Sequence, residues 1–327
     1  MADIARLAGV STATVSRALA NNPVIPQELR DRIATLARAK GYVVDQQARG
    51  LRLQRTQTIG IVIPLGHESK QQITDPFFQE MVSRLADEIT LRGFEVLLSK
   101  VSEPTVGWLD RIVQSKRCDG VLIIGQSDQH AVLNAMAATY RPMVVWGGDL
   151  PDRLYCTVGV DNRLGARLAV QHLIGKGRRR IAFLGMPDAP EVGLRREGYL
   201  AALAEADLPP SPELLVPTHF MLDTAQAAVE ALIESNIVFD ALFAASDLIA
   251  VTAIQALTKA GRSVPEDVSV VGFDDIALAR YSAPPLSTIR QDLAAGAKAM
   301  VDMVFRRIAG EDTGSLFMTP ELVRRGT

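Results

Sequence analysis

The chain has 327 residues, 48% of them hydrophobic, and a formal net charge of −2 at pH 7, which excludes a disordered chain and allows two or three domains with large cores. No stretch reaches the roughly 18 uninterrupted apolar residues that cross a bilayer, and residues 1–9 lack the basic and apolar segments of a signal peptide, so we expect a cytoplasmic protein without a membrane partner. The nearly neutral total hides a basic N-terminus, because residues 1–55 hold nine Lys or Arg and four Asp or Glu, a net charge of +5.

The first expected helix lies in the sequence DIARLAG. Its predicted apolar face comprises Ile4, Ala5, Leu7 and Ala8. Gly9 can adopt the left-handed conformation that ends a helix, because it has no Cβ. A second helix follows after a short turn, which is the arrangement of a helix-turn-helix unit.

The second helix lies in STATVSRALAN, with Ser11 as a good N-cap. Its inward face repeats at helical spacing: Val15, Ala18 and Leu19. The outward face comprises Thr12, Ala13, Ser16 and Arg17. An arginine can bond a guanine edge, a threonine can bond a base or phosphate, and an alanine methyl suits a thymine methyl. An ordinary helix pair with a solvated face is the alternative interpretation of these residues alone.

A third helix is expected from Pro26, in the first helical position, to a C-terminal cap at Gly41. Its apolar stripe comprises Leu29, Ile33, Leu36 and Ala37. Three short helices make a small all-α DNA-binding head, which we assign to residues 1–44. An arginine-rich linker follows at residues 45–57.

From residue 58 onward, short apolar runs such as IGIVIP, GVLIIG and VSVVGF alternate with amphipathic helical stretches. This alternation indicates βαβ units with buried parallel sheets. Two doubly wound lobes fit the length. We assign residues 58–160 and 289–318 to an N-lobe, and residues 161–288 and 319–327 to a C-lobe. Ligands of such folds bind beyond the C-terminal ends of the strands, so the cleft between the lobes is the expected pocket.

Several other site chemistries lack support in the sequence. Cys118 and Cys156 have no Cys or His partner at metal-ligand spacing, so we interpret them as buried free thiols. The four histidines show no metal-binding spacing either. The GKGRRR stretch at residues 175–180 precedes a strand and does not fit a dinucleotide-binding loop. We therefore expect no metal, no cofactor and no enzyme activity.

Taken together, the motifs resemble the lactose-repressor/galactose-repressor (LacI/GalR) family of bacterial transcription regulators. The resemblance covers the whole chain, and its landmarks stand in family order: DIARLAGVSTATVSRALAN, AKGY, ARGLR, TIGIVIP, DPFF, DGVLIIG, VGVDN, HLIGKGRRRIAFLG, RREGY, AASDLIA, VPEDVSVVGFDD and ELVRRG. It implies a helix-turn-helix head followed by two lobes of the periplasmic-binding-protein type. It also implies a homodimer on a palindromic double-stranded DNA operator. The N-lobe helix at residues 77–92 is the expected dimer surface.

The resemblance assigns DNA contacts in two segments. In the head, Thr12, Ala13 and Arg17 would read the major groove, and Ser11 and Ser16 would contact phosphates. Residues 46–53 would form a hinge helix only when two copies meet on DNA. The expected hinge contacts are Ala48, Arg49, Leu51 and Arg52, with Leu51 as an apolar wedge in a minor-groove step.

Two features depart from the family pattern. The first helix begins at Asp3, a few residues short of the usual start. Val44 and Asp45 stand where the family usually carries a Pro-Asn pair. The carboxylate of Asp45 is unfavourable near a DNA backbone, although it can still cap the hinge helix.

Nine residues are predicted to bind an effector in the cleft. Five of them stand at or just after strand ends: Gln126, Trp146, Phe220, Asp247 and Asp274. The resemblance implies polar contacts from Arg195, Asp274 and Asp161, and apolar walls from Phe77, Phe78 and Phe220. The alternatives are a structural ion pair for Arg195 and Asp274, core packing for the two adjacent phenylalanines, and a helix cap for Asp247.

Forked donors and acceptors beside aromatic faces suit a neutral polyhydroxylated ring, so a mono- or oligosaccharide is the expected effector. The segments QITDPFFQEM and VVWGGD resemble regulators of α-glucoside use. A purine or another small polar metabolite is the alternative.

The expected mechanism is linkage: an effector that misplaces the paired hinge helices must lower DNA affinity. We therefore predict a repressor of sugar-utilisation genes that its effector releases from DNA. A corepressor-activated regulator is the alternative. A sugar-binding protein without DNA function should lack the basic head.

Overall fold

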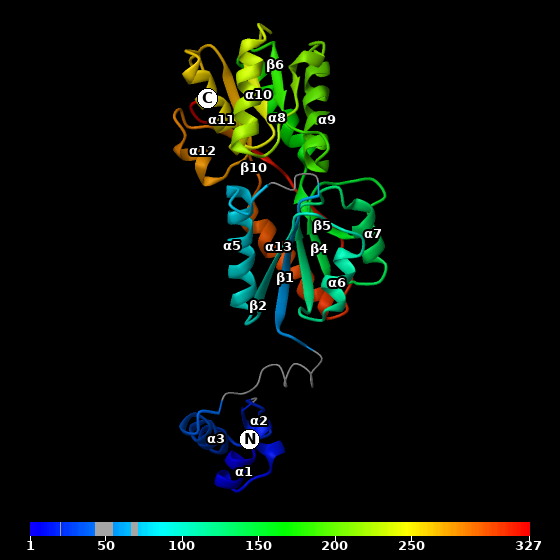
Figure 1. The fold of residues 1–327 in the computed structure, drawn as a ribbon, viewed down its shortest axis with the longest axis vertical. Helices are drawn as coiled ribbons and strands as arrows, with labels where there is room; N and C mark the ends of the chain where they lie inside the picture. The colour runs from blue at the N-terminus through cyan, green and yellow to red at the C-terminus, as the bar shows by residue number, and fades with distance from the viewer. Residues whose placement is uncertain (20, 43–54, 67–70) are drawn as a thin grey trace. The chain divides into compact units, whose positions relative to one another are not determined.

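The computed structural model describes residues 1–19, 21–42, 55–66 and 71–327. The chain divides into two compact units, residues 1–56 and 57–327 (Figure 1). Each unit has its own buried core. Within the described residues, no helix is long and apolar enough to cross a membrane.

The first unit contains three described helices, α1 (Ala2–Ala8), α2 (Thr12–Leu19) and α3 (Gln27–Ala39). Gly9 ends α1 with φ +66°, and the hydroxyl of Ser11 accepts the N–H of Thr14 at 3.1 Å at the start of α2. Both predicted caps are confirmed. Pro26 lies just before α3, at its N-cap position, and not at the first helical position that the sequence predicts.

The core of this unit forms where the three helices meet. Ile4, Val15 and Ile33 are fully buried there, as their helical spacing predicts. Leu7 is 45% exposed, so its assignment to the apolar face of α1 is wrong. The inward face of α1 is made by Ile4, Ala5 and Ala8, and α2 and α3 cover that face without reaching Leu7.

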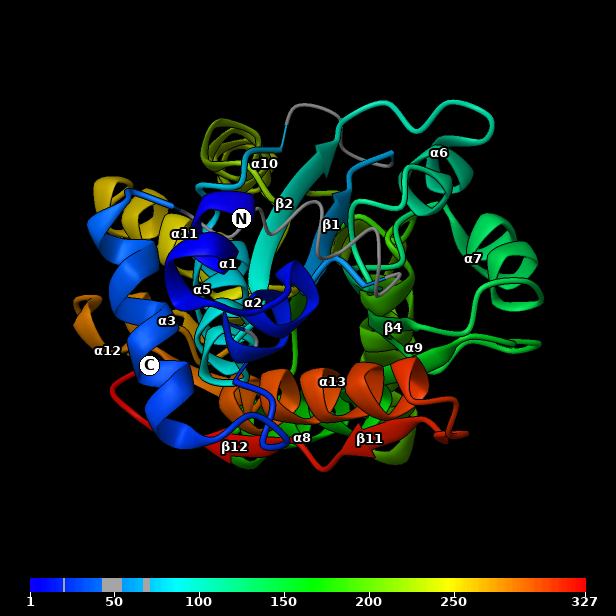
Figure 2. The ribbon, with the colours of Figure 1, turned by 90° about the horizontal axis from the view of Figure 1, so that it is seen from below.

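The N-lobe of the second unit is built on a parallel sheet with the strand order β11-β5-β4-β3-β1-β2. Its strands are β1 (Thr58–Pro64), β2 (Glu95–Val101), β3 (Gly120–Ile124), β4 (Met143–Trp146), β5 (Cys156–Val160) and β11 (Leu316–Met318). Its described helices are α5 (Pro76–Leu91), α6 (Trp108–Gln114), α7 (His130–Ala137) and α13 (Leu293–Ile308). Figure 2 shows α5 and α13 on one side of this sheet and α6 and α7 on the other, each pair with its own core cluster.

The C-lobe sheet has the strand order β12-β10-β9-β8-β6-β7. Its strands are β6 (Ile181–Leu184), β7 (Leu215–Val216), β8 (Ala241–Ala244), β9 (Ser269–Asp274), β10 (Ser287–Arg290) and β12 (Glu321–Val323). Its helices are α8 (Asn162–Gly175), α9 (Pro190–Glu205), α10 (Leu222–Glu234), α11 (Asp247–Lys259), α12 (Ala277–Tyr281) and the 3-10 turn η1 (Pro212–Leu214). The pairing is parallel except for the edge strand β12, which runs antiparallel to β10.

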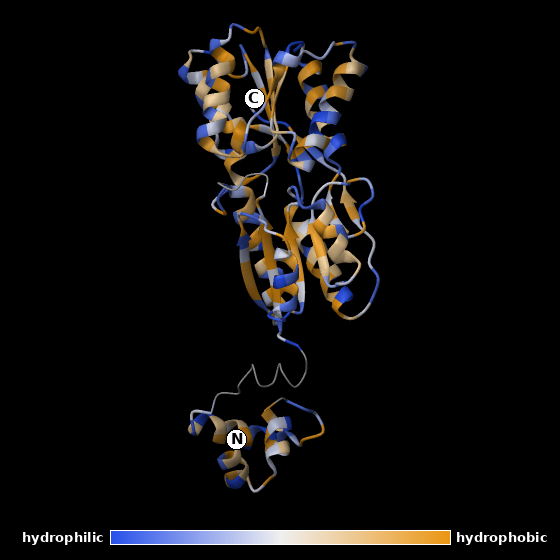
Figure 3. Ribbon diagram, turned by 45° about the vertical axis from the view of Figure 1, so that its right-hand side comes forward, coloured by the Kyte–Doolittle hydropathy of each residue, from blue (hydrophilic) through white to orange (hydrophobic). Residues whose placement is uncertain are grey.

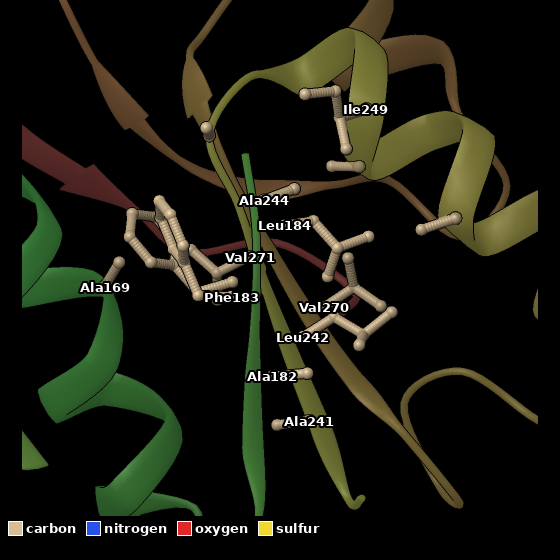
Figure 4. Close-up of a cluster of buried hydrophobic side chains, with 14 of the residues drawn as sticks. Ala169, Ala182, Phe183, Leu184, Ala241, Leu242, Ala244, Ile249, Val270 and Val271 are labelled. Carbon is tan, nitrogen blue, oxygen red and sulfur yellow. The ribbon is translucent and has the colours of Figure 1, made fainter. Parts of the chain in front are cut away.

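The central strands are buried on both faces because helices cover both sides of each sheet. Figure 3 shows the apolar residues concentrated along the strands and on the helix faces turned toward them. In Figure 4, Phe183 of β6 points toward Ala169 of α8, and its neighbour Leu184 points to the opposite side, toward Ile249 of α11. Continuous apolar runs therefore form the strands here, as the sequence predicts.

The chain passes between the lobes at three described points. It leaves the N-lobe between β5 and α8, returns between β10 and α13, and leaves again between β11 and β12. The second passage follows Arg290, because β10 pairs with β9 along its whole length. Since the strands of each sheet are mostly parallel, their C-terminal ends gather at one edge of each lobe, and the cleft lies beside these edges.

Candidate functional site

The outward face of α2 is free to contact a partner. Thr12, Ala13 and Arg17 are exposed, and Ser16 is half-buried. The side chain of Arg17 has no hydrogen bond or ion pair with any described residue. Its guanidinium donors are therefore available to a ligand outside the chain.

Ser11 caps α2, and this structural role is separate from the phosphate contact that the sequence predicts. Its hydroxyl accepts the N–H of Thr14 at 3.1 Å and lies 2.9 Å from the hydroxyl of Thr14. Ser11 thus fixes the first turn of α2, which carries the exposed face. The contact with phosphate stays a prediction, because the hydroxyl is also exposed.

The predicted hinge contacts lie outside the described residues. They are Ala48, Arg49, Leu51 and Arg52, and the departure at Val44 and Asp45 lies there too. The hinge helix therefore stays a prediction.

The second unit holds a cavity between its lobes, which we call the interlobe cavity. It encloses about 710 Å³ of space, part of it open to solvent. Six of the nine residues predicted for the cleft line it: Phe77, Phe78, Trp146, Arg195, Phe220 and Asp274. They come from the start of α5, the end of β4, the start of α9, the segment after β7 and the end of β9.

Arg195 and Asp274 face each other in this cavity. Nη2 of Arg195 lies 3.9 Å from Oδ1 of Asp274, and both side chains are 7% exposed. Nε of Arg195 donates to Oδ1 of Asn162 at 2.8 Å, and Nη1 donates to the carbonyl of Ala245. The guanidinium also stacks on Phe273, 3.7 Å from the ring centroid. The rest of the lobe therefore orients the guanidinium and leaves Nη2 turned toward the carboxylate.

A glycine allows Arg195 to reach this position. Gly198 stands one turn after Arg195 on α9, and a Cβ there would collide with the carbonyl oxygen of Arg163 on α8. The absence of a side chain at Gly198 lets α9 pack closely on α8. This close packing brings Arg195 to Asn162 at the start of α8.

The backbone at the end of β9 is held in an unusual conformation. Asp274 has φ +119° and Asp275 has φ +58°, both in the range that favours glycine. The carboxylate of Asp275 is clamped by Arg290, whose Nε donates to it at 2.7 Å, and by Arg325. These two bonds hold the turn that places Asp274 in the cavity.

Burial dominates the electrostatics of Asp274. Loss of solvation raises the pKa of its carboxyl to about 7, although Arg195 and a hydrogen bond from Gln291 act in the opposite direction. The negative charges of Asp75 and Glu80 raise the pKa further. Burial also lowers the pKa of Arg195, and the charge of Asp274 opposes this change.

The aromatic residues form the apolar walls. Phe77 and Phe78 meet edge to face, with ring centroids 5.7 Å apart. Phe78 and Trp146 also belong to the N-lobe core, and Phe220 packs against the C-lobe core. These side chains therefore pack in or against the lobe cores and also line the interlobe cavity.

The other three predicted residues do not line the cavity. Asp161 caps α8 by accepting the N–H of Leu164 at 2.9 Å. Asp247 is fully buried and accepts from the N–H of Ile276 and the hydroxyl of Thr288. Ser246, and not Asp247, is the N-cap of α11.

Gln126 is the third of the predicted effector residues that do not line the interlobe cavity. Its side-chain amide donates to the carbonyl of Gly148 at 3.0 Å and to the hydroxyl of Tyr155 at 2.8 Å. Its side-chain oxygen accepts the N–H of Gly148 at 2.9 Å. These bonds tie the end of β3 to the segment after β4.

Sequence reasoning missed six polar residues of the cavity: Gln71, Asp75, Ser127, Glu191, Ser246 and Gln291. Gln291 directly follows β10, so the strand-end rule could have found it. Asp75 opens the DPFF motif and caps α5 through the N–H of Phe77, 3.0 Å away. Gln71 carries no local signal, because only the folding of the N-lobe brings it to the cavity.

Metal chemistry has no support in the parts of the chain that the structure describes. No group of three or more His, Cys, Asp or Glu could hold a metal ion there. Cys118 and Cys156 are buried free thiols, as predicted.

Two protein families match separate parts of the chain. Residues 1–45 match the bacterial regulatory proteins of the lacI family. Residues 170–327 match a periplasmic binding protein-like domain.

Similar proteins cover nearly the whole chain. It is 31% identical to the HTH-type transcriptional regulator CelR of Thermobifida fusca, over 95% of this chain and 92% of that protein. It is 30% identical to the HTH-type transcriptional repressor CytR of Escherichia coli strain K12, over 100% of this chain and 95% of that protein.

Two solved structures share the fold. A complex of the regulator CelR with cellobiose gives a TM-score of 0.74 at 29% identity, covering 99% of this chain and 98% of that chain. A lac repressor dimer bound to operator and the anti-inducer ONPF gives a TM-score of 0.84 at 24% identity, covering 99% and 97%.

Proposed function

The chain belongs to the lacI family of bacterial regulatory proteins, and from this premise we propose that it represses sugar-utilisation genes and leaves a palindromic operator when a small sugar binds in the interlobe cavity. Family membership makes it a DNA-binding transcriptional regulator. The operator symmetry, the sugar and the direction of the response are the proposed parts.

The exposed face of α2 supports the DNA-binding part of the proposal. Thr12, Ala13 and Arg17 would contact base edges in the major groove, while Ser11 and Ser16 would contact phosphates. Arg17 is the strongest candidate, because its guanidinium is exposed and has no partner among the described residues. Arginine can bond both acceptors of a guanine edge.

The observation that carries the sugar proposal is the Arg195–Asp274 pair among aromatic walls. A sugar presents hydroxyls that can donate to a carboxylate and accept from a guanidinium, and C–H faces that can lie on aromatic rings. The binding of cellobiose by the related CelR supports a sugar for this chain as well. We propose a mono- or oligosaccharide, with an α-glucoside as the first candidate.

Release from DNA would follow from linkage between the two ligands. A sugar that bridges the lobes favours one lobe arrangement, and DNA favours the arrangement in which paired hinge helices fit the operator. If these arrangements differ, each ligand lowers the affinity of the other by the same factor. Asp161, Gln126 and Asp247 would act by holding the cavity walls in place.

We propose that the protein acts as a homodimer, since one helix-turn-helix unit reads only half of a palindrome. We propose that exposed apolar side chains of the N-lobe contribute to this contact. Leu91 at the end of α5 is 80% exposed, and Leu98 on the edge strand β2 is 42% exposed. An edge strand with exposed apolar side chains favours pairing with another chain.

The test combines ligand screening with DNA release. The full-length protein is screened by thermal shift against maltose, cellobiose, glucose and a set of purine nucleosides, and operator DNA is selected from a random library. We expect a sugar to raise the melting temperature and to release the DNA. If only a nucleoside stabilises the protein, the effector is a nucleoside and not a sugar. If the ligand tightens DNA binding, the ligand is a corepressor.

A cavity variant connects the two readouts. Asp274→Ala should abolish release by the sugar and leave DNA binding intact, because Asp274 lies in the cavity. Glu234→Ala is the matched control, since this exposed carboxylate ends α10 outside the cavity lining. Retained release in Asp274→Ala would rule out the interlobe cavity as the effector site.

A further inference from the structure

One buried acceptor in the interlobe cavity has no partner. Gln71 is 4% exposed and lines the cavity. Its Nε2 donates to Oδ2 of Asp75 at 2.9 Å, but its Oε1 is buried without a hydrogen bond. Because an unpaired buried carbonyl is costly, this oxygen is poised to accept a donor from a ligand.

The orientation of this amide is set by its neighbour. Asp75 accepts from Nε2 of Gln71 and from the N–H of Phe77. Exchanging the amide oxygen and nitrogen would place the oxygen of Gln71 against a carboxylate, which is repulsive. The two residues therefore form an acceptor pair on the N-lobe side of the cavity, which we call the Gln71–Asp75 pair.

Across the cavity, the C-lobe also presents acceptors. The carboxylate of Asp274 accepts from Gln291 at 2.6 Å, and Glu191 accepts the N–H of Gln126 at 3.4 Å. Asp75, Glu191 and Asp274 thus place three carboxylates in the lining, against the single guanidinium of Arg195. Arg195 already donates to Asn162 and to the carbonyl of Ala245. At pH 8, above the pKa of Asp274, the cavity lining therefore has surplus acceptors and an excess of negative charge.

We propose that the Gln71–Asp75 pair determines specificity by accepting hydrogen bonds from hydroxyls of an uncharged sugar, and that the excess of carboxylates makes the cavity reject phosphorylated and carboxylated sugars. This inference rests on the proposed sugar effector and names its chemical class. A phosphate brought near these carboxylates would be repelled in a partly desolvated site, where screening is weak. Hydroxyls instead satisfy the free acceptors of both lobes at once.

The first experiment compares matched ligands by isothermal titration of the full-length protein at pH 8. The probes are glucose, maltose and cellobiose, each paired with its phosphate: glucose 6-phosphate, maltose 6′-phosphate and cellobiose 6′-phosphate. We expect the tightest neutral sugar to bind about tenfold or more tightly than its phosphate. Equal or tighter binding of the phosphate would overturn the inference.

Variants test the acceptor pair itself. Gln71→Met keeps the length of the side chain and removes the free oxygen together with the Nε2 donor to Asp75. It should weaken binding of the neutral sugar about tenfold or more, the value of one lost hydrogen bond. Gln72→Met is the matched control, because Gln72 is exposed and outside the cavity lining. It should change the affinity by less than about twofold. An affinity equal to the wild type in Gln71→Met would overturn the role of the pair.

A charge variant tests the rejection of anions. Asp75→Asn preserves an N-cap at the start of α5 and removes one negative charge. The variant should lower the ratio of the affinity for the neutral sugar to the affinity for its phosphate by several-fold. An unchanged ratio would assign the discrimination elsewhere and overturn this part of the inference. Far-UV circular dichroism and the melting temperature of each variant check that it is folded.

The outcomes separate the inference from the function on which it rests. If none of the six sugars binds while a purine nucleoside stabilises the protein in the thermal-shift screen, the sugar-effector proposal fails, and the inference fails with it. If a phosphorylated sugar binds best and releases operator DNA, the sugar-effector proposal stands and the specificity inference is wrong.

Discussion

Nη2 of Arg195 and Oδ1 of Asp274 lie 3.9 Å apart, and both side chains are almost completely buried. Arg195 comes from α9, and Asp274 comes from the end of β9. The guanidinium reaches this carboxylate only because Asn162, Ala245 and Phe273 orient it. The pair therefore depends on the packing of the whole C-lobe, and its removal should be felt in stability as well as in binding.

Replacement of Arg195 should strongly destabilise the C-lobe. In Arg195→Met, the oxygen of Asn162 and the carbonyl of Ala245 lose a donor, and Asp274 loses its compensating charge. Removing one partner of a buried ion pair typically costs about 3–5 kcal/mol. Urea unfolding at pH 8 without ligand measures the change.

The control for this prediction is an exposed ion pair on the same lobe. Arg163 pairs with Glu197, and their side chains are 47% and 57% exposed. Arg163→Met should cost about 1 kcal/mol or less, since solvent screens such pairs. Similar losses in both variants would contradict a special role for the buried pair.

The raised pKa of Asp274 predicts a pH dependence of stability. An unfolded aspartate titrates near 3.9, whereas burial raises the pKa of Asp274 to about 7 in the folded protein. The folded state therefore binds more protons, so stability is lost as the pH rises through the folded pKa. Between pH 5 and pH 8 the loss should be on the order of 2 kcal/mol.

The comparison with Asp274→Asn tests Asp274 together with Asp247, because the charge of Asp274 also raises the pKa of Asp247. Arg195, Asp75, Glu80 and Asp247 act on Asp274 or share its surroundings, and all of them remain in the variant. The wild type should lose stability relative to Asp274→Asn between pH 5 and pH 8, measured by urea unfolding. A stability difference that stays constant over this range would show that Asp274 does not titrate there.

Arg17→Ala should weaken discrimination between operator and scrambled DNA. A bidentate contact with guanine contributes about 1–3 kcal/mol of discrimination, so the ratio of the two affinities should fall accordingly in fluorescence anisotropy. The thermal response to the effector should stay intact. Arg32→Ala removes an exposed charge from α3 and should lower both affinities with little change in their ratio. An unchanged ratio in Arg17→Ala would remove Arg17 from base reading.

Two substitutions of Ser11 should separate capping from DNA binding. Ser11→Ala removes the acceptor of the Thr14 N–H, and loss of an N-cap costs about 1 kcal/mol, so hydrogen exchange in α2 should accelerate. Ser11→Asp keeps a capping oxygen but repels phosphate, so exchange should stay slow while DNA affinity falls. Equal DNA affinity of wild type and Ser11→Asp would argue against a phosphate near this residue.

Local sequence predicted the elements well where a residue's role depends on its immediate neighbours. Gly9 ends α1 and Ser11 caps α2, as the sequence predicts, because capping needs only a flexible backbone or a nearby oxygen. The apolar runs predicted buried parallel strands, although the strand β7 spans only Leu215–Val216. The prediction for Leu7 is wrong because helical spacing alone does not say which side of α1 the other helices cover.

For the cavity, the strand-end rule located the correct edge of each sheet but not the direction of each side chain. Asp274 and Asp247 stand at similar places, yet the left-handed backbone at Asp274 turns it into the cavity. Asp247 instead turns to Thr288 and to the N–H of Ile276.

By itself, the sequence determined the helix caps, the buried strands and the residue types available to a ligand, because these depend on local backbone chemistry and hydrophobic periodicity. Only the tertiary structure decided that Gln71 and Asp75 meet Arg195 and Asp274 around one cavity. The physical reason is that the two pairs come from different lobes. The surroundings that they share, and the electrostatic effect of each carboxylate on the others, arise only when both lobes line the same cavity.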